Sequence, residues 1–457
     1  MDAKLEAGEA APSGAFGTLA RRGARKRPGR RPAKNPEAPL GAEALVQTIH
    51  RHFAFVNEMF NGVGDPRCPS RILYSPATLL WTATLGFMNR CGSRNAMDAD
   101  RNDEGYALTV ADLSAQDWWP EGEARTTPCM GTVCGFLEHV DPAHLEAVLT
   151  TTVSRLIRRK QLDWARFNGC FVIAVDGTKQ ENCRAGHVVD GKTRRMVLEA
   201  KLIGPNGLSL ALLSEPMDQY DDERGKHDCE LKAFKRLAAR LKTAFPKLAI
   251  CIVGDAIYAC EPVFEICQRN GWSFILTFKE GSHPAVAADV EALMKMEEEN
   301  HAAVDLEGGR IDLRWIEGVQ FPSRKLQVVR CMETGRQPYN GAFVTALRVC
   351  EADAALAVCV WGRQRWNIES DFNVEKHGGF GLEHTFCTSD KQATNMHLLM
   401  LFGHLLWQVV FLGVLRRLYA GCRKLAQKKL AKLIERALHL LGPPSTGRQF
   451  QLRFSSS

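Results

Sequence analysis

Phe171-Val172-Ile173-Ala174-Val175-Asp176-Gly177-Thr178 is a short apolar run that stops at a carboxylate. Its β-branched residues favour a strand, and an uninterrupted apolar strand is typical of one that is buried on both faces of a sheet. A carboxylate at the end of such a strand has a rigid base and open surroundings, which suits chemistry. An Asp-Gly pair also occurs in ordinary turns, and for this segment alone the two interpretations are equally compatible.

The elements after this strand predict one mixed sheet. They are a hairpin, a long amphipathic helix, a second buried strand, a short helix and a third buried strand, over residues 196–213, 228–245, 248–253, 261–268 and 272–278. This order is that of ribonuclease-H-like nucleases, an α/β fold with a mixed sheet and helices. The second buried strand ends at Gly254-Asp255. The order therefore predicts that Asp176 and Asp255 lie on neighbouring strand ends, within reach of shared metal ions.

A third acid lies in the segment from Arg363 to Lys376, which contains no helix breaker and predicts a continuous helix. Arg365 stands four residues before Glu369 and shares a helix face with it, and Lys376 returns to that face two turns later. One acid between two bases on one face indicates a metal ligand bordered by phosphate contacts. For this segment alone, a solvated helix with an ordinary ion pair is the commoner explanation.

The rest of the chain divides into units of different composition. The predicted units are a basic disordered tail, a helical module, a first part of the catalytic domain, a β-rich insertion, a second part of that domain, and a basic C-terminal helix and tail, over residues 1–40, 41–165, 166–280, 281–350, 351–415 and 416–457. The tail is as compatible with solubilising the protein as with settling on DNA phosphates. For the helical module, DNA binding and a purely structural role are equally compatible.

Composition limits the class of protein and its surroundings. The chain has 457 residues, 45% of them hydrophobic, and a formal net charge of +7, which permits a polyanionic partner without requiring one. Fifteen cysteines and no visible export signal predict a reducing, cytoplasmic location. The nearly apolar stretch from Met396 to Leu415 is long enough to span a bilayer, but His397, His404 and Gln408 interrupt it. We therefore predict a buried core helix and no membrane partner.

Residues 165–415 resemble the DDE transposases of bacterial insertion sequences, in the subgroup whose β-strand insertion precedes the catalytic glutamate. The resemblance rests on the order of the three acids and on the local sequences of residues 227–232, 253–258 and 365–384. The tyrosine–arginine–glutamate–lysine signature of that subgroup is matched at Arg365, Glu369 and Lys376, whereas its tyrosine position falls on Gly362. Of the cysteine- and histidine-rich stretch found in many similar members, only Cys183 and His187 remain, and two ligands do not close a zinc site.

The resemblance implies a transposase that cleaves transposon ends and joins the freed 3′-hydroxyl to target DNA, as a dimer in a synaptic complex. It implies that Asp176, Asp255 and Glu369 hold two Mg²⁺ ions, for which Mn²⁺ can substitute, and that Arg365 and Lys376 grip phosphates. Trp366 is expected either to stack on a displaced base or, as the commoner role, to pack in the core. Two alternatives stay open. One is a stand-alone ribonuclease-H-like DNA nuclease. The other is an inactive transposase remnant that binds DNA without cutting it, with the missing tyrosine as the sign of sequence divergence.

Overall fold

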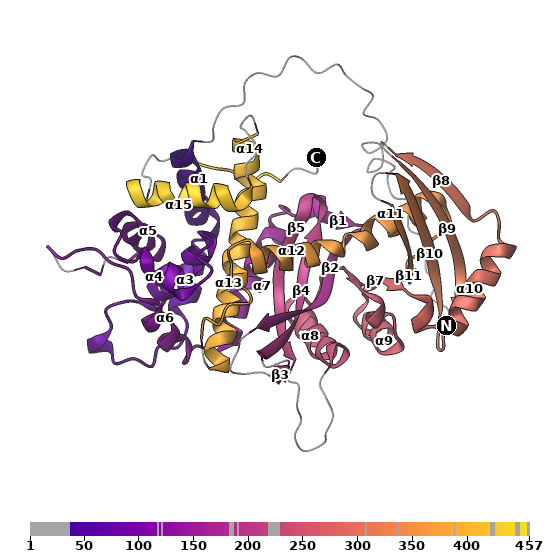
Figure 1. The fold of residues 1–457 in the computed structure, drawn as a ribbon, viewed down its shortest axis with the longest axis horizontal. Coiled ribbons are helices and arrows are strands. Elements are labelled where there is room, and N and C mark those ends of the chain that lie inside the picture. The colour runs from indigo at the N-terminus through magenta and orange to yellow at the C-terminus, as the bar shows by residue number, and fades with distance from the viewer. Residues whose placement is uncertain are drawn as a thin grey trace, which may run out of the picture.

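The computed structural model describes residues 37–454 except for short gaps at 117, 120–121, 182–186, 190–191, 218–228, 307–308, 336–337, 388, 421–425 and 444–447. Almost all of the predicted basic tail, together with Cys183, lies outside the described residues. Figure 1 shows helices of the N-terminal part at one end of the molecule, a central sheet, and further strands at the other end.

The central strands form the mixed sheet that the sequence predicts. In space the order is β5-β4-β2-β6-β7, in which β2, β4 and β5 are antiparallel neighbours and β6 and β7 run parallel to β2. Their bounds are Cys170–Glu181 for β2, Lys192–Gly204 for β4, Leu208–Met217 for β5, Ile250–Gly254 for β6 and Ser273–Phe278 for β7. Two short strands, β1 (Arg166–Phe167) and β3 (His187–Val189), pair with β2 and β4. The α/β, ribonuclease-H-like fold class is therefore confirmed.

Alternate residues of the strands face two different layers of helices. On one face, Val172 and Ala174 of β2 belong to a core that includes Ile368 and Phe372. This layer consists of α11 (Ala352–Arg363) and α12 (Trp366–His377). The other face packs on α8 (Glu230–Ala244) and α9 (Glu261–Asn270). Side chains two apart in a strand share a face, so every second residue of β2 points toward α12.

The predicted β-rich insertion is present, but it continues the main sheet. The antiparallel strands β8 (His301–Leu306), β9 (Gly309–Gln320), β10 (Lys325–Gly335) and β11 (Tyr339–Thr345) extend the sheet because β11 pairs with β7. The helix before them, α10 (Pro284–Met296), begins seven residues earlier than the predicted helix at Glu291. Pro284 stands in its first turn, where a missing N–H costs nothing.

The N-terminal part is helical, as predicted, and the long apolar helix near the C-terminus packs against it. Its helices are α1 (Ala38–Phe53), α2 (Phe55–Asn61), α3 (Pro76–Met88), α4 (Arg94–Ala99), α5 (Glu104–Ser114), α6 (Met130–Leu137) and α7 (Pro142–Arg158). The apolar helix, α13 (Asp390–Val410), packs on α3, α7 and β5 and leads through a π-turn into α14 (Arg416–Leu418). It is long and apolar enough to cross a membrane, but most of it is buried within the protein, as predicted.

The C-terminal helix α15 (Gln427–Leu441) lies across α1 and α5 (Figure 1). The start predicted for it, at Cys422, falls among residues that the structure does not describe. Its buried face includes Leu430, Ile434 and Leu438. Lys428 and Lys429 are exposed, as expected of an amphipathic helix with one solvated face.

Candidate active site

The first predicted acid, Asp176, lies inside β2 and not at its end, because β2 continues to Glu181. The pairing of β2 with the parallel strand β6 is shorter, and its last rung joins Ala174 to Val253. Asp176 is two residues beyond this rung and points to the same face as Ala174. Its Oδ1 accepts a hydrogen bond of 3.0 Å from the backbone N–H of Gly177.

The second acid, Asp255, follows β6 directly and is also two residues beyond the last β2–β6 rung. Its Oδ1 accepts a 3.0 Å hydrogen bond from the N–H of Ile257, which caps a short 3₁₀ turn. Because the two strands are parallel neighbours, the backbone positions of Asp176 and Asp255 lie side by side at one edge of their ladder.

The third acid, Glu369, lies on α12 and is joined to Asp176 by Arg365. The Nη1 atom of Arg365 is 2.5 Å from Glu369 Oε1 and 3.8 Å from Asp176 Oδ2. The Arg365 side chain is only 12% exposed, so its guanidinium is held between the two carboxylates and not in bulk solvent. The i,i+4 relationship read from the sequence therefore holds, although the continuous helix that was expected there does not.

The chain from Arg363 to Lys376 breaks between α11 and α12. Arg365 N–H bonds to the carbonyl of Gly362, and Ile368 N–H to that of Arg365, so i→i+3 bonds tighten the backbone into a turn. Gly362 is packed so closely that an added Cβ would lie 2.5 Å from Phe343 Cε1. The glycine at the signature's tyrosine position is therefore demanded by the contact between α11 and β11.

The other residues predicted around the glutamate have different surroundings. Lys376 Nζ is 3.2 Å from Glu383 Oε1, in the loop after α12, and the contacts of the described residues include none between Lys376 and Glu369. Trp366 is 54% exposed, with the Arg365 guanidinium 5.4 Å from its ring centroid. The expected packing of Trp366 in the core is thus wrong, because the first turn of α12 points it outward.

A fourth carboxylate, Glu230, was missed. It is the first residue of α8, and its Oε2 accepts a 3.1 Å hydrogen bond from the Tyr258 hydroxyl. Its Oε1 lies against the backbone beside Asp176, since a Cβ on Gly177 would be 2.6 Å from that oxygen. Glu230 stands within the stretch 227–232 that resembles the transposases, but no spacing rule marked it as a site residue.

The carboxylates outnumber the bases here, and burial disfavours the charged forms of Asp176 and Glu230. Burial raises the pKa of Asp176 to about 7; Glu369 and Glu230 add to the rise, and Arg365 and the Gly177 N–H oppose it. Burial also raises the pKa of Glu230; the Tyr258 hydrogen bond opposes that rise and the charge of Asp255 adds to it. An excess of carboxylate oxygens in partly buried positions fits a hard divalent cation such as Mg²⁺ or Mn²⁺.

Two groups of ligating side chains in the described part of the chain have donor atoms that all lie within 4.8 Å of one another: Cys91, Asp100 and Glu435, and Asp371, Glu375 and His404. The three predicted acids do not form such a group. Their carboxylates would therefore have to draw closer together around an ion.

No protein-family model and no curated protein sequence matches this chain. Among solved structures, it is weakly similar to the piggyBac transposase synaptic complex with hairpin DNA, with a TM-score of 0.36 and 10% sequence identity. The similarity covers 89% of this chain and 83% of that chain. At these values the likeness assigns no family.

Proposed function

We propose that this protein is a DDE-type DNA transposase that works by metal-assisted phosphoryl transfer. The observation that carries the proposal is the position of Arg365, whose guanidinium contacts Glu369 and approaches Asp176, although these two acids are 193 residues apart in the sequence. Acids that converge at the end of a parallel strand pair in a ribonuclease-H-like sheet are suited to phosphoryl transfer.

The roles of the acids follow from their chemistry. Asp176, Asp255 and Glu369 would hold two Mg²⁺ ions, or Mn²⁺ in their place. When bound, such ions activate a water or a 3′-hydroxyl and stabilise the leaving oxygen. Burial raises the pKa of Asp176 to about 7, so this carboxyl group would give up its proton more readily with a cation beside it. Glu230 adds negative charge to the same place.

The bases and the exposed aromatic ring supply contacts to DNA. Arg365 would hold the phosphate beside the scissile bond while it keeps Asp176 and Glu369 in register, and Lys376 would contact a phosphate further along. Trp366, which is exposed next to Arg365, is free to stack on a displaced base. The reaction hydrolyses a strand at the transposon end and then joins the 3′-hydroxyl to target DNA, within a dimeric synaptic complex in the cytoplasm.

Two other functions fit part of the same site. A stand-alone DNA nuclease would cleave but not join ends, and an assay for strand transfer separates it from a transposase. An inactive DNA-binding remnant was suggested by the missing signature tyrosine. That suggestion loses force, because Phe343 fills the space beside Gly362 and gives the glycine a packing reason.

The direct test is cleavage of a duplex that carries the inverted repeats flanking the coding region, with Mg²⁺ or Mn²⁺. Replacing Asp176, Asp255 or Glu369 with Ala should abolish cleavage and leave DNA binding largely intact. Asp289→Ala, which removes an exposed acid on α10, is the matched control and should cleave normally. Normal cleavage by Glu369→Ala would show that the third ligand is wrongly assigned.

A further inference from the structure

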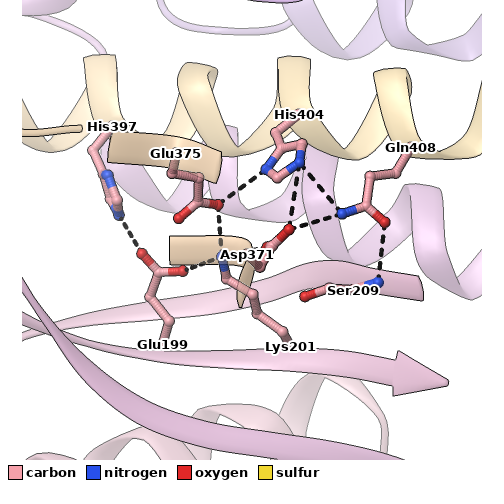
Figure 2. A network of polar contacts seen from close by, with 8 residues as sticks. All are labelled: Glu199, Lys201, Ser209, Asp371, Glu375, His397, His404 and Gln408. Atoms are coloured by element: carbon pink, nitrogen blue, oxygen red, sulfur yellow. Dashed lines mark hydrogen bonds and ion pairs between the residues drawn. The ribbon is translucent and has the colours of Figure 1, made fainter. Parts of the chain in front are cut away.

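A buried network of charged and polar side chains lies between β4, α12 and α13 (Figure 2). We call it the buried charge network, and its members are Glu199, Lys201, Asp371, Glu375, His397, His404 and Gln408. They come from β4, α12 and α13, and each is at most 7% exposed. Charges of this kind are rarely buried, because removal from water costs more than an ordinary ion pair returns.

Lys201 of β4 is the centre of this network and reaches α12 at three points. Its Nζ is 2.8 Å from Asp371 Oδ2 and 2.6 Å from Glu375 Oε1, and it lies 4.7 Å from the centre of the Phe372 ring. A further contact of 3.0 Å joins it to Glu199 on its own strand. The ammonium group therefore connects one strand to two successive turns of the helix.

The third element, α13, completes the partners of the two helix acids. His404 Nδ1 is 3.1 Å from Glu375 Oε1, and Gln408 Nε2 donates a 2.9 Å hydrogen bond to Asp371 Oδ1. The Gln408 side-chain oxygen accepts a 3.0 Å hydrogen bond from the backbone N–H of Ser209 in β5. These directional contacts leave α12 little freedom to turn about its axis.

These contacts matter because α12 has few apolar residues that pack against the sheet. Its buried residues are Ile368, Asp371, Phe372 and Glu375, so two of the four are acids, and Lys201 contacts both of them. Apolar contacts are non-directional and tolerate sliding, whereas a shared ammonium fixes both rotation and height. A slip of one residue would turn Glu369 by about 100° away from its present direction.

The register of the sheet links the contacts of Lys201, which clamp α12 on β4, to the acid site formed by Asp176, Asp255 and Glu369. In the β2–β4 ladder Asp176 is opposite Glu199, and Ala174 is opposite Lys201. Asp176 and Lys201 therefore lie on the same face of two adjacent strands, the face that α12 covers. Lys201 contacts the α12 acids at positions 371 and 375, two and six residues after Glu369 on the same helix.

We propose that Lys201 is a positioning residue for the acid site, whose ammonium fixes α12 on β4 so that Glu369 faces Asp176. The clamp itself follows from the contacts above, and its purpose rests on the proposed function. Lys201 touches none of Asp176, Asp255 and Glu369 among the contacts of the described residues. Its effect on the site would therefore be transmitted through the helix.

The test compares Lys201→Met, which keeps the length of the side chain and removes its charge, with Leu438→Ala. Leu438 is fully buried on α15, which packs on α1 and α5, so its loss destabilises the protein away from α12. Amide hydrogen exchange of residues 366–377 and Mn²⁺ binding by electron paramagnetic resonance are measured for both variants, well below their melting temperatures. For Lys201→Met we expect faster exchange in α12 and a Kd for Mn²⁺ raised about 10-fold or more. For Leu438→Ala both should equal those of the wild type.

Glu375→Gln keeps the shape of the side chain and removes its charge, and it serves if Lys201→Met does not fold. It should raise the Kd for Mn²⁺ by about 3-fold, less than the 10-fold expected for loss of a whole supporting contact. Unchanged Mn²⁺ binding and unchanged α12 exchange in the folded variants would overturn the positioning role.

The two proposals fail in different ways. If wild-type Mn²⁺ binding survives Asp176→Ala and Glu369→Ala, the proposed function is wrong, and the exchange of α12 alone then decides whether Lys201 clamps the helix. If those acids do bind Mn²⁺ and Lys201→Met loosens α12 without weakening the binding, the clamp is structural only and the positioning role is overturned.

Discussion

Asp176 of β2 lies directly opposite Glu199 of β4, and the two carboxylates have contrasting surroundings. Burial works against ionisation of Glu199, but Lys201 and His397 outweigh it and bring its pKa to about 2. At Asp176, burial prevails over Arg365 and raises the pKa to about 7. One rung of the sheet thus carries one acid whose charged form is stabilised by Lys201 and His397 and one whose charged form is disfavoured by burial.

Asp176→Asn should stabilise the protein at neutral pH while abolishing its activity. The folded-state pKa of about 7 is above the ordinary value of 3.8, so the folded protein binds more protons than the unfolded chain between these values. Stability from this residue is therefore lost as the pH rises from 3.8 to about 7. We expect Asp176→Asn to gain about 2–4 kcal/mol at pH 8 and nearly nothing at pH 4. Urea unfolding with EDTA at both pH values measures this; an equal effect at both would contradict it.

Glu230→Gln should lower the pH at which the site takes up a cation. Its negative charge raises the pKa of Asp176, so its removal makes Asp176 easier to ionise. The midpoint of Mn²⁺ binding against pH, measured by electron paramagnetic resonance, should fall below that of the wild type. The control is Glu383→Gln, an acid that pairs with Lys376 in the loop after α12, which should leave the midpoint unchanged. A midpoint that rises in Glu230→Gln would indicate that this carboxylate is itself a ligand.

Features of the fold and the site that arise from local sequence patterns could be predicted, whereas those that arise from tertiary contacts could not. The apolar strands and their order follow from periodicity, and the positions of Asp176 and Asp255, two residues beyond one rung, follow from that order. The break at Arg365 gave no signal, because it arises from tertiary contact between Gly362 and Phe343.

The buried charge network could not be predicted from the sequence, for a different reason. Charged side chains are usually exposed, so a local pattern does not single out Asp371 and Glu375 as buried residues. Their partners, Lys201 and His404, lie 170 residues before Asp371 and 29 residues after Glu375. No local pattern connects residues at such separations, and only the folded chain brings the charges together.

Arg365→Gln and Lys376→Gln should both weaken binding to duplex DNA, and each should reduce the salt dependence of the binding constant by about one phosphate contact. They should differ in chemistry. Arg365 lowers the pKa of Asp176, so its loss should also move the pH midpoint of Mn²⁺ binding upward. Lys376 pairs with Glu383 and should leave that midpoint unchanged. Binding by filter retention at several salt concentrations measures the first effect; unchanged binding in both variants would leave them as structural ion pairs.

Gly362→Ala should destabilise the protein, although alanine normally favours a helix by about 1 kcal/mol over glycine. The new Cβ would lie 2.5 Å from Phe343 Cε1, and Phe343 is buried on β11 at 2% exposure, so its ring has nowhere to move. Overpacking of this kind costs about 1–3 kcal/mol. Phe343→Leu should cost stability alone, yet in the double variant it should recover part of the loss, giving a coupling free energy of about 1 kcal/mol in a double-mutant cycle. Additive effects would place the cause elsewhere in α11. A stable, active Gly362→Tyr would show that the site accepts the signature tyrosine after all, and that the glycine is not a packing requirement.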